Sequence, residues 1–238
     1  MSFNYLASMK QFTRKEFYDA YRDSYGEKTY DAIDYALRKE VVAGNIVHVG
    51  RNQYAYVKDK RFYKYEYSDV AGKVAAEIKK EYPSVDFQIF ELTQLNAFVN
   101  HLYAHNTIFV YVENDAIDYV FDTLRDEHPG RIMLKPRVDE YFKYLVDDQI
   151  VIMRLPSESP RGIDEPWKSR LEKILVDIMV DKLLTHIVSE GEYDSIFSHA
   201  FDRYLVDIGA MLRYANRKGA GVKFRDRIEE YTDIAIGE

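Results

Sequence analysis

Three adjacent side chains, Arg51, Asn52 and Gln53, offer one guanidinium cation and two amides in the middle of the segment GNIVHVGRNQYAYV. Groups of this kind donate hydrogen bonds to phosphate oxygens and to acceptors on base edges. Residues 46–49 and 54–57 on either side are rich in β-branched and aromatic residues, which predicts the two strands of a hairpin. The three side chains would then project from a hairpin tip, where they can reach a polyanion such as DNA.

A second group of candidate DNA contacts precedes the hairpin, on a helix predicted over about residues 27–43. Lys28 and Thr29 lie at its N-terminal end, where free backbone N–H groups attract phosphate. Further along, Tyr35 is expected to influence which sequence is bound, and Arg38 adds positive charge. Together with the hairpin tip, these residues form the predicted DNA-binding set.

Two carboxylates on the same helix, Asp31 and Asp34, oppose this interpretation. They fall on the side away from Ile33 and Leu37, where a DNA-reading face would lie, and a carboxylate there repels phosphate. A carboxylate can instead accept a hydrogen bond from the amino group of cytosine. The two aspartates therefore leave open whether the helix meets DNA.

The elements that must position these side chains follow the order helix, helix, turn, helix, hairpin. A first helix is expected around residues 3–9, and Thr13 with Glu16 fits a capping box at the start of the second. Gly44 stands where a left-handed residue ends the third. This order is typical of a winged helix-turn-helix. Winged helices bind DNA or act as protein-interaction modules, so both functions stay open.

Composition and charge favour an ordered chain with two differently charged parts. The 238 residues are 47% hydrophobic, enough for one large or two small domains, and the absence of Cys excludes disulfides and thiolate metal sites. Residues 1–68 carry a net charge of +3, whereas residues 69–238 carry −10. No apolar run approaches the roughly 18 residues of a membrane span, and the N-terminus lacks a signal-peptide pattern. We therefore expect a cytoplasmic protein without a membrane partner.

Residues 67–238 are predicted to form a mixed α/β domain that ends in helices. Helix-like and strand-like segments alternate at first, which indicates an α/β layer structure. The predicted helices cover about residues 68–82, 93–105 and 114–127, and the predicted strands cover 86–90, 107–112, 131–134 and 149–155. Residues 155–166 have loop composition, and the pattern is helical from Trp167 onward. The predicted fold class is thus α/β (α+β), with residues 1–66 as a winged helix-turn-helix and 67–238 as the second domain.

No arrangement of residues indicates catalysis. His101 and His105 stand at i,i+4 on an expected helix, a spacing that can hold zinc, but no further ligand accompanies them. Glu113, Asp115 and Asp118 begin a helix, where acids commonly lie close to free N–H groups. We expect no enzymatic activity, cofactor or metal ion. The alternative is a metal-dependent nuclease whose motif is not recognisable.

Residues 203–227 form a basic segment inside the acidic part of the chain. They contain seven Lys or Arg residues against two Asp, a net charge of +5. A local excess of this size predicts an anion-binding or partner-binding site, although placement at helix ends explains part of it.

Six short motifs, taken in order, resemble the AbiEi-like family of bacterial antitoxins and transcriptional regulators. They are V-G-R-N-Q-Y, T-I-F-V-Y-V-E, A-I-D-Y-V-F, L-P-S-E-S-P, L-E-K-I-L-V-D and L-R-Y-A-N-R-K, and they extend over nearly the whole chain. The resemblance implies an N-terminal winged helix that binds inverted repeats in the promoter of its own operon. It also implies a C-terminal domain that counteracts a co-encoded nucleotidyltransferase-like toxin in an abortive-infection system, directly or functionally.

The resemblance also suggests which residues take part. At the wing the family more often has R-G-x-Y, and Asn52 replaces that glycine here. Lys173 lies in the L-E-K-I-L-V-D motif, while Arg213, Arg217 and Lys218 lie in L-R-Y-A-N-R-K. We assign these four cations to partner binding, and no catalytic role follows from the resemblance.

Overall fold

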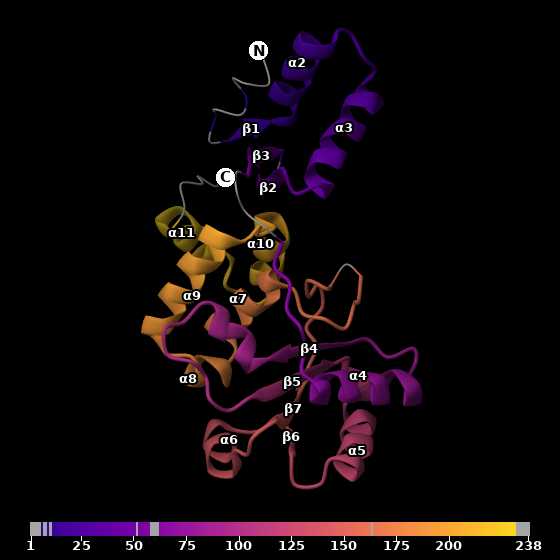
Figure 1. Ribbon diagram of the computed structural model, residues 1–238, viewed down its shortest axis with the longest axis vertical. Coiled ribbons are helices and arrows are strands. Elements are labelled where there is room, and N and C mark those ends of the chain that lie inside the picture. Colours follow the sequence, from indigo (N-terminus) through magenta and orange to yellow (C-terminus); the bar gives the residue numbers. More distant parts are fainter. Residues whose placement is uncertain are drawn as a thin grey trace. The chain divides into compact units, whose positions relative to one another are not determined.

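The computed structural model describes Leu6, Met9 and residues 11–50, 52–57, 62–162 and 164–231. The chain forms two compact units, one from residues 1–63 and 198–238 and the other from residues 64–197. Each unit combines helices with a β-sheet, so the fold is mixed α/β as predicted (Figure 1).

Two capped helices open the first unit. Helix α2 (Arg14–Tyr25) begins with the predicted capping box, because the Glu16 N–H donates to Thr13 Oγ1 (3.2 Å) and the Thr13 N–H donates to the Glu16 carboxylate (2.6 Å). Helix α3 (Tyr30–Val42) begins three residues later than predicted. The reason is Thr29, whose hydroxyl accepts from the Ala32 N–H at 3.3 Å and so acts as the N-cap.

Gly44 ends α3 as predicted. Its φ of +75° is a left-handed conformation that residues with a Cβ rarely adopt. The Asn45 N–H donates to the Glu40 carbonyl and the Gly44 N–H donates to the Val41 carbonyl, both at 3.0 Å. These two bonds form a Schellman motif, which turns the chain directly into the hairpin.

The sheet of the first unit contains β1 (Phe12–Thr13), β2 (Ile46–Gly50) and β3 (Gln53–Tyr56) in the antiparallel order β1-β3-β2. The hairpin β2–β3 confirms the prediction, whereas β1 was missed because two residues are too short to show a pattern. Phe12 in β1 stacks on Tyr54 in β3, with ring centroids 5.9 Å apart. The core of this part consists of Leu6, Phe12, Phe17, Ala20, Ile33, Leu37, Ile46 and Tyr54. Apart from Leu6 and Met9, the helix expected over residues 3–9 lies outside the described residues.

The C-terminal helices complete the first unit. They are the end of α9 (Glu190–Arg203), α10 (Ile208–Arg217) and α11 (Gly221–Tyr231), and α10 contacts both α11 and β2. Asp207 caps α10, since its carboxylate accepts from the Ala210 N–H at 2.8 Å. The structure thus corrects the expected division at residue 66, because residues 198–231 join the hairpin instead of the second domain.

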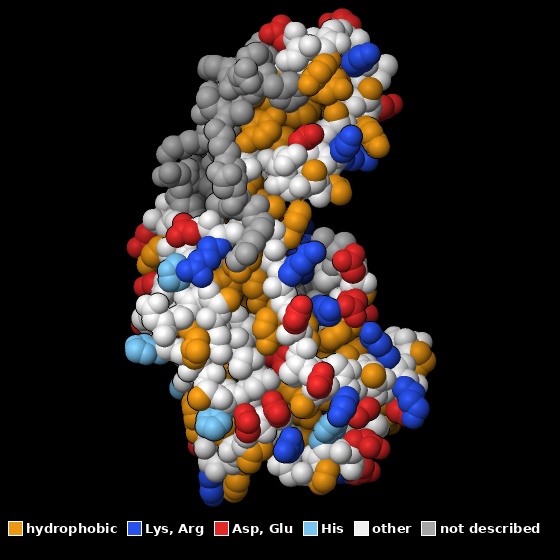
Figure 2. All heavy atoms as spheres, in the orientation of Figure 1, with side chains coloured by type: hydrophobic (Ala, Val, Ile, Leu, Met, Phe, Trp, Pro, Cys, Tyr) orange, Lys and Arg blue, Asp and Glu red, His pale blue; other side chains and the backbone are white. Residues whose placement is uncertain are grey.

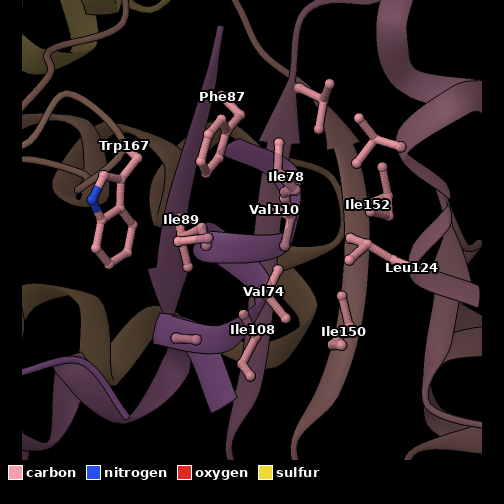
Figure 3. Close-up of a cluster of buried hydrophobic side chains, with 14 of the residues drawn as sticks. Val74, Ile78, Phe87, Ile89, Ile108, Val110, Leu124, Ile150, Ile152 and Trp167 are labelled. Atoms are coloured by element: carbon pink, nitrogen blue, oxygen red, sulfur yellow. The ribbon is translucent and has the colours of Figure 1, made fainter. Parts of the chain in front are cut away.

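The second unit is built on a four-stranded mixed sheet. Its strands are β4 (Phe87–Glu91), β5 (Thr107–Val112), β6 (Ile132–Leu134) and β7 (Gln149–Arg154), in the order β4-β5-β7-β6. Strand β5 pairs antiparallel with β4 and parallel with β7, and all six of its residues are buried. Helices α4 (Asp69–Glu81) and α5 (Ile117–Glu127) cover one face with an apolar core that includes Val74, Ile89, Val110 and Ile152 (Figure 3).

Shorter helices connect and cover the remainder of this unit. They are η1 (Leu92–Ala97), η2 (Asn114–Ala116), α6 (Val138–Tyr144), α7 (Leu171–Val180) and α8 (Leu184–Ile187). The helix predicted over residues 93–105 was wrong, because the chain is helical only as far as Ala97. Asn96 explains this, since its side-chain oxygen accepts from the Tyr103 N–H at 2.7 Å and closes a loop in place of further helical turns.

Candidate nucleic-acid interface

Helix α3 presents two opposite faces. Ile33 and Leu37 point into the core, with 0% and 3% of their surface exposed. On the other side Tyr35 is 72% exposed, and Arg38 is exposed one turn further on. Figure 2 shows hydrophobic and basic side chains next to each other over α3. The predicted contacts Tyr35 and Arg38 therefore share one accessible face.

The N-terminal end of α3 holds the next two predicted contacts. Lys28 is exposed immediately before the cap, and Thr29 is exposed as the cap itself. Because the Thr29 hydroxyl already accepts from the Ala32 N–H, Thr29 mainly fixes the start of the helix. The positive end of the helix dipole and the Lys28 ammonium then favour an anion at the same place.

Asp34 is compensated inside the protein. The Tyr18 hydroxyl donates to Asp34 Oδ1 at 2.5 Å, and Arg14 Nε lies 3.6 Å from the same oxygen. Burial, and then the hydrogen bond to Asp34, raise the pKa of Tyr18 to about 12, so this hydroxyl keeps its proton at neutral pH. The negative charge of Asp34 is thus partly satisfied by α2, which weakens the objection that it repels phosphate. Asp31 is exposed in the first turn of α3.

The hairpin tip contains Asn52 in a left-handed conformation, with φ +58°. Asparagine tolerates this region better than other residues with a Cβ, and glycine adopts it freely. That preference explains physically why a glycine suits this position of the hairpin. Gln53 is half-buried and pairs with Thr13 in β1, whereas Arg51 lies outside the described residues.

Helix α10 packs closely on the hairpin strand β2. At Gly209, a Cβ atom would lie 3.6 Å from the Cβ of His48 and 3.4 Å from a carboxylate oxygen of Asp207. Burial lowers the pKa of His48, the cations Arg14 and Arg213 lower it further, and Asp207 opposes them. The hairpin is therefore supported from outside by a helix that lies about 160 residues away in sequence.

Three of the predicted partner-binding cations lie on or just after α10. Arg213 and Arg217 are exposed, and Lys218, which is half-buried, places its ammonium 5.9 Å from the centre of the Tyr214 ring. The basic segment consequently belongs to the unit that contains the hairpin. Residues 1–63 and 198–238 together carry a net charge of +3, and residues 64–197 carry −10.

The fourth predicted partner contact, Lys173, lies inside the second unit. Its side chain is 1% exposed, and its ammonium lies 2.5 Å from Asp177 Oδ2 and 3.2 Å from the centre of the Tyr111 ring. Lys173 thus pairs with Asp177 at i,i+4 inside the protein, and the predicted surface role of Lys173 is corrected. Every residue of α7 from Leu171 to Met179 is buried, so this helix is an internal element.

Two groups of residues considered in the sequence, the histidine pair and the acidic residues that follow β5, form no metal site in the described part of the chain. His101 and His105 lie in the loop after η1, so the helical i,i+4 spacing does not exist. Glu113 accepts from the Asp86 N–H at 3.2 Å, at the edge of the sheet. Across the described ranges, no three His, Asp or Glu residues gather as metal ligands, and no helix there has the length and apolar character to cross a bilayer.

Sequence reasoning missed the contacts that join distant elements of the interface. Strand β1 closes the sheet against β3, and Arg14 and Tyr18 reach across from α2 to Asp34. The one available signal was the spacing of Arg14 and Tyr18 at i,i+4, which places them on the same face of α2. Nothing in the local pattern indicated that Asp34 would meet them.

A protein-family model, described as a family of unknown function (DUF6577), matches residues 32–234 of the chain. The match begins inside α3 and extends through both compact units to α11. No curated protein matches the chain.

Proposed function

The chain belongs to the family of unknown function DUF6577, and we propose that it is the DNA-binding repressor and antitoxin of a bacterial toxin–antitoxin operon. It would bind inverted repeats in its own promoter through the N-terminal helices and hairpin. It would also counteract a co-encoded nucleotidyltransferase-like toxin of the abortive-infection type.

The observation that carries the DNA-binding part is the path of the chain from β1 to β3. A short strand, two helices and a hairpin follow one another, and β3 lies between β1 and β2. This arrangement is typical of a winged helix, in which the last helix before the hairpin enters the major groove and the hairpin tip meets the neighbouring backbone. We infer that α3 enters the groove and that the connection between β2 and β3 meets the neighbouring backbone.

The charges of the first unit support the same proposal. Lys28, Arg38 and Lys39 are exposed on or beside α3, and Asp34 is compensated by Arg14. Phosphate contacts of this kind position a protein on DNA without reading sequence. They are the contacts whose removal weakens binding to every sequence alike.

We expect the protein to shift a duplex that covers the DNA upstream of its own gene in a gel assay at low salt. Changing Arg38 to Ala is expected to weaken binding about tenfold or more, because this change removes a charge-assisted hydrogen bond to phosphate. The Arg51→Ala variant at the hairpin tip is expected to behave similarly.

The matched control is Arg125→Ala, which removes an exposed arginine from α5 in the acidic second unit. Its affinity for the duplex is expected to equal that of the unmodified protein. A protein that shifts no DNA at low salt would overturn the repressor proposal. An equal loss of DNA affinity in all three variants would show that α3 and the hairpin do not form the DNA-binding surface.

The antitoxin part rests on the resemblance to the AbiEi-like family. We expect co-expression of this chain to restore colony formation in cells that express the nucleotidyltransferase-like product of the adjacent gene. Arg213 and Arg217 are the exposed cations assigned to the partner, so an Arg213→Ala/Arg217→Ala variant is expected to rescue growth poorly. Full rescue by that variant would show that Arg213 and Arg217 do not contact the partner. No rescue by the unmodified chain would exclude the antitoxin function.

The second candidate function is a protein-interaction module that does not bind DNA. The exposed apolar residues Tyr35 and Val42 on α3 favour it, since large exposed apolar groups also mark protein interfaces. Co-purification with the product of the adjacent gene, with no DNA shift at any salt concentration, would select this function over the first.

A further inference from the structure

The exposed face of α3 carries a stripe of four side chains that the fold itself does not require. Asp31, Tyr35, Arg38 and Val42 follow one another at spacings of four, three and four residues, so they lie along one side of the helix. Tyr35 is 72% and Val42 80% exposed. On the opposite side of α3, Ile33 and Leu37 already pack into the core.

Tyr35 differs from its neighbour Tyr30, which is also exposed. Tyr30 lies against the Tyr18 ring at 5.4 Å and under the Arg22 guanidinium at 4.7 Å, so its position has an internal explanation. Tyr35 points away from the buried side of the same helix, at the middle of the stripe. The Tyr35 ring and the Val42 side chain are therefore both accessible to a partner from the same side of α3.

The charges around the stripe select its ligand. Lys28 precedes the N-terminal end of α3, and Arg38 and Lys39 lie near the C-terminal end, so cations stand on both sides of Tyr35. The exposed carboxylate of Asp31, at the N-terminal end of the stripe, opposes phosphate there but can accept a hydrogen bond from the amino group of cytosine. This arrangement matches a ligand with negative charge on either side of an apolar centre. The major groove of duplex DNA has that form, because phosphates line its edges and the thymine 5-methyl group is the apolar feature on its floor.

Resting on the proposed DNA-binding function, we propose that Tyr35 and Val42 contact thymine methyl groups and give the protein a preference for thymine in its site. The two residues are about 10 Å apart along the helix axis. That separation corresponds to about three base-pair steps, so the preferred thymines lie about three positions apart. Arg38, between them in the stripe, contacts phosphate or a base acceptor.

The test compares two otherwise identical duplexes that cover the DNA upstream of the gene, one amplified with dTTP and the other with dUTP. Uracil pairs as thymine does but lacks the 5-methyl group. We expect the unmodified protein to bind the uracil duplex about fourfold more weakly for each thymine methyl group that it would otherwise touch. If two copies of the protein bind one site, the factors for all contacted methyl groups multiply.

The variants separate the ring from its hydroxyl. Tyr35→Phe keeps the apolar ring, so it is expected to retain the difference between the two duplexes. Tyr35→Ala is expected to bind thymine DNA more weakly and to lose most of that difference. Tyr119→Ala, which removes a 66% exposed tyrosine from α5, is the matched control and is expected to behave as the unmodified protein.

The outcomes distinguish this inference from the function on which it rests. Equal affinity for thymine and uracil duplexes, with both clearly shifted, would overturn thymine recognition and leave DNA binding in place. If the Tyr35→Ala variant still bound the thymine duplex more tightly than the uracil duplex, Tyr35 would not be the residue that contacts the methyl group. No binding to either duplex would overturn both proposals, and unchanged thermal unfolding of Tyr35→Ala would show that the variant is folded.

Discussion

Changing Lys173 to Met is expected to lower the free energy of unfolding of the second unit by about 3–5 kcal/mol, the usual cost of removing one partner from a buried ion pair. Lys173 and Asp177 are each 1% exposed, and their charged atoms lie 2.5 Å apart. Without the ammonium, the Asp177 carboxylate would be held away from water without the cation that pairs with it at i,i+4. The face of the buried Tyr111 ring would also lose its cation.

The measurement is unfolding in urea, followed by the fluorescence of Trp167. This residue is the single tryptophan of the chain and is buried in the same unit, so its signal reports on that unit. The matched control is Lys182→Met, an exposed lysine just after α7, for which we expect a change within about 0.5 kcal/mol.

A double variant separates the ion pair from simple packing. Replacing Lys173 by Met and Asp177 by Leu together removes both charges, and most of the stability is expected to return. A Lys173→Met protein that unfolds normally but fails to restore colony formation in the co-expression assay would contradict the internal role. That result would instead support the predicted role of Lys173 in partner binding.

Raising the salt concentration from 50 to 200 mM is expected to weaken DNA binding about 10⁴-fold. Lys28, Arg38, Lys39 and Arg51 provide four candidate phosphate contacts for each copy of the chain. The inverted repeat that we propose as the site would hold two copies. Each neutralised phosphate releases counterions, so about eight contacts give a slope of about −7 in a plot of log affinity against log salt.

The slope is measured by titrating the protein into labelled DNA at several salt concentrations. Lys28→Ala is expected to make the slope shallower by about one for each bound copy, whereas Arg125→Ala in the second unit leaves it unchanged. A slope near zero, with binding intact, would show that phosphate contacts contribute little. In that case the cations around α3 would have another partner.

The two predictions assign different tasks to cations that look alike in the sequence. Lys173 and Arg38 each occupy a helix with apolar residues at regular spacing, yet Lys173 is buried against Asp177 and Arg38 is exposed. The difference arises because α7 is buried along its whole length from Leu171 to Met179, whereas α3 is covered on one side. A cation on a helix can therefore be assigned to a partner only when both sides of the helix are known.

The sequence by itself determined the elements whose causes lie within a few residues. The Thr13–Glu16 capping box and the left-handed Gly44 were both predicted at the correct residues. The hairpin strands and the fully buried strand β5 were also predicted, because period and composition are visible over four to six residues. The mixed α/β class followed from the alternation of such segments.

Only the tertiary structure decided which surfaces meet. The sequence indicated a helical pattern over the residues of α10 but not which surface would cover this helix, and in the structure α10 contacts β2 in the first unit. Likewise, Asp34 looked unfavourable for DNA until Tyr18 and Arg14 were placed beside it. The physical reason is that caps and turns are satisfied by neighbours along the chain, whereas burial and charge compensation depend on residues that folding alone brings together.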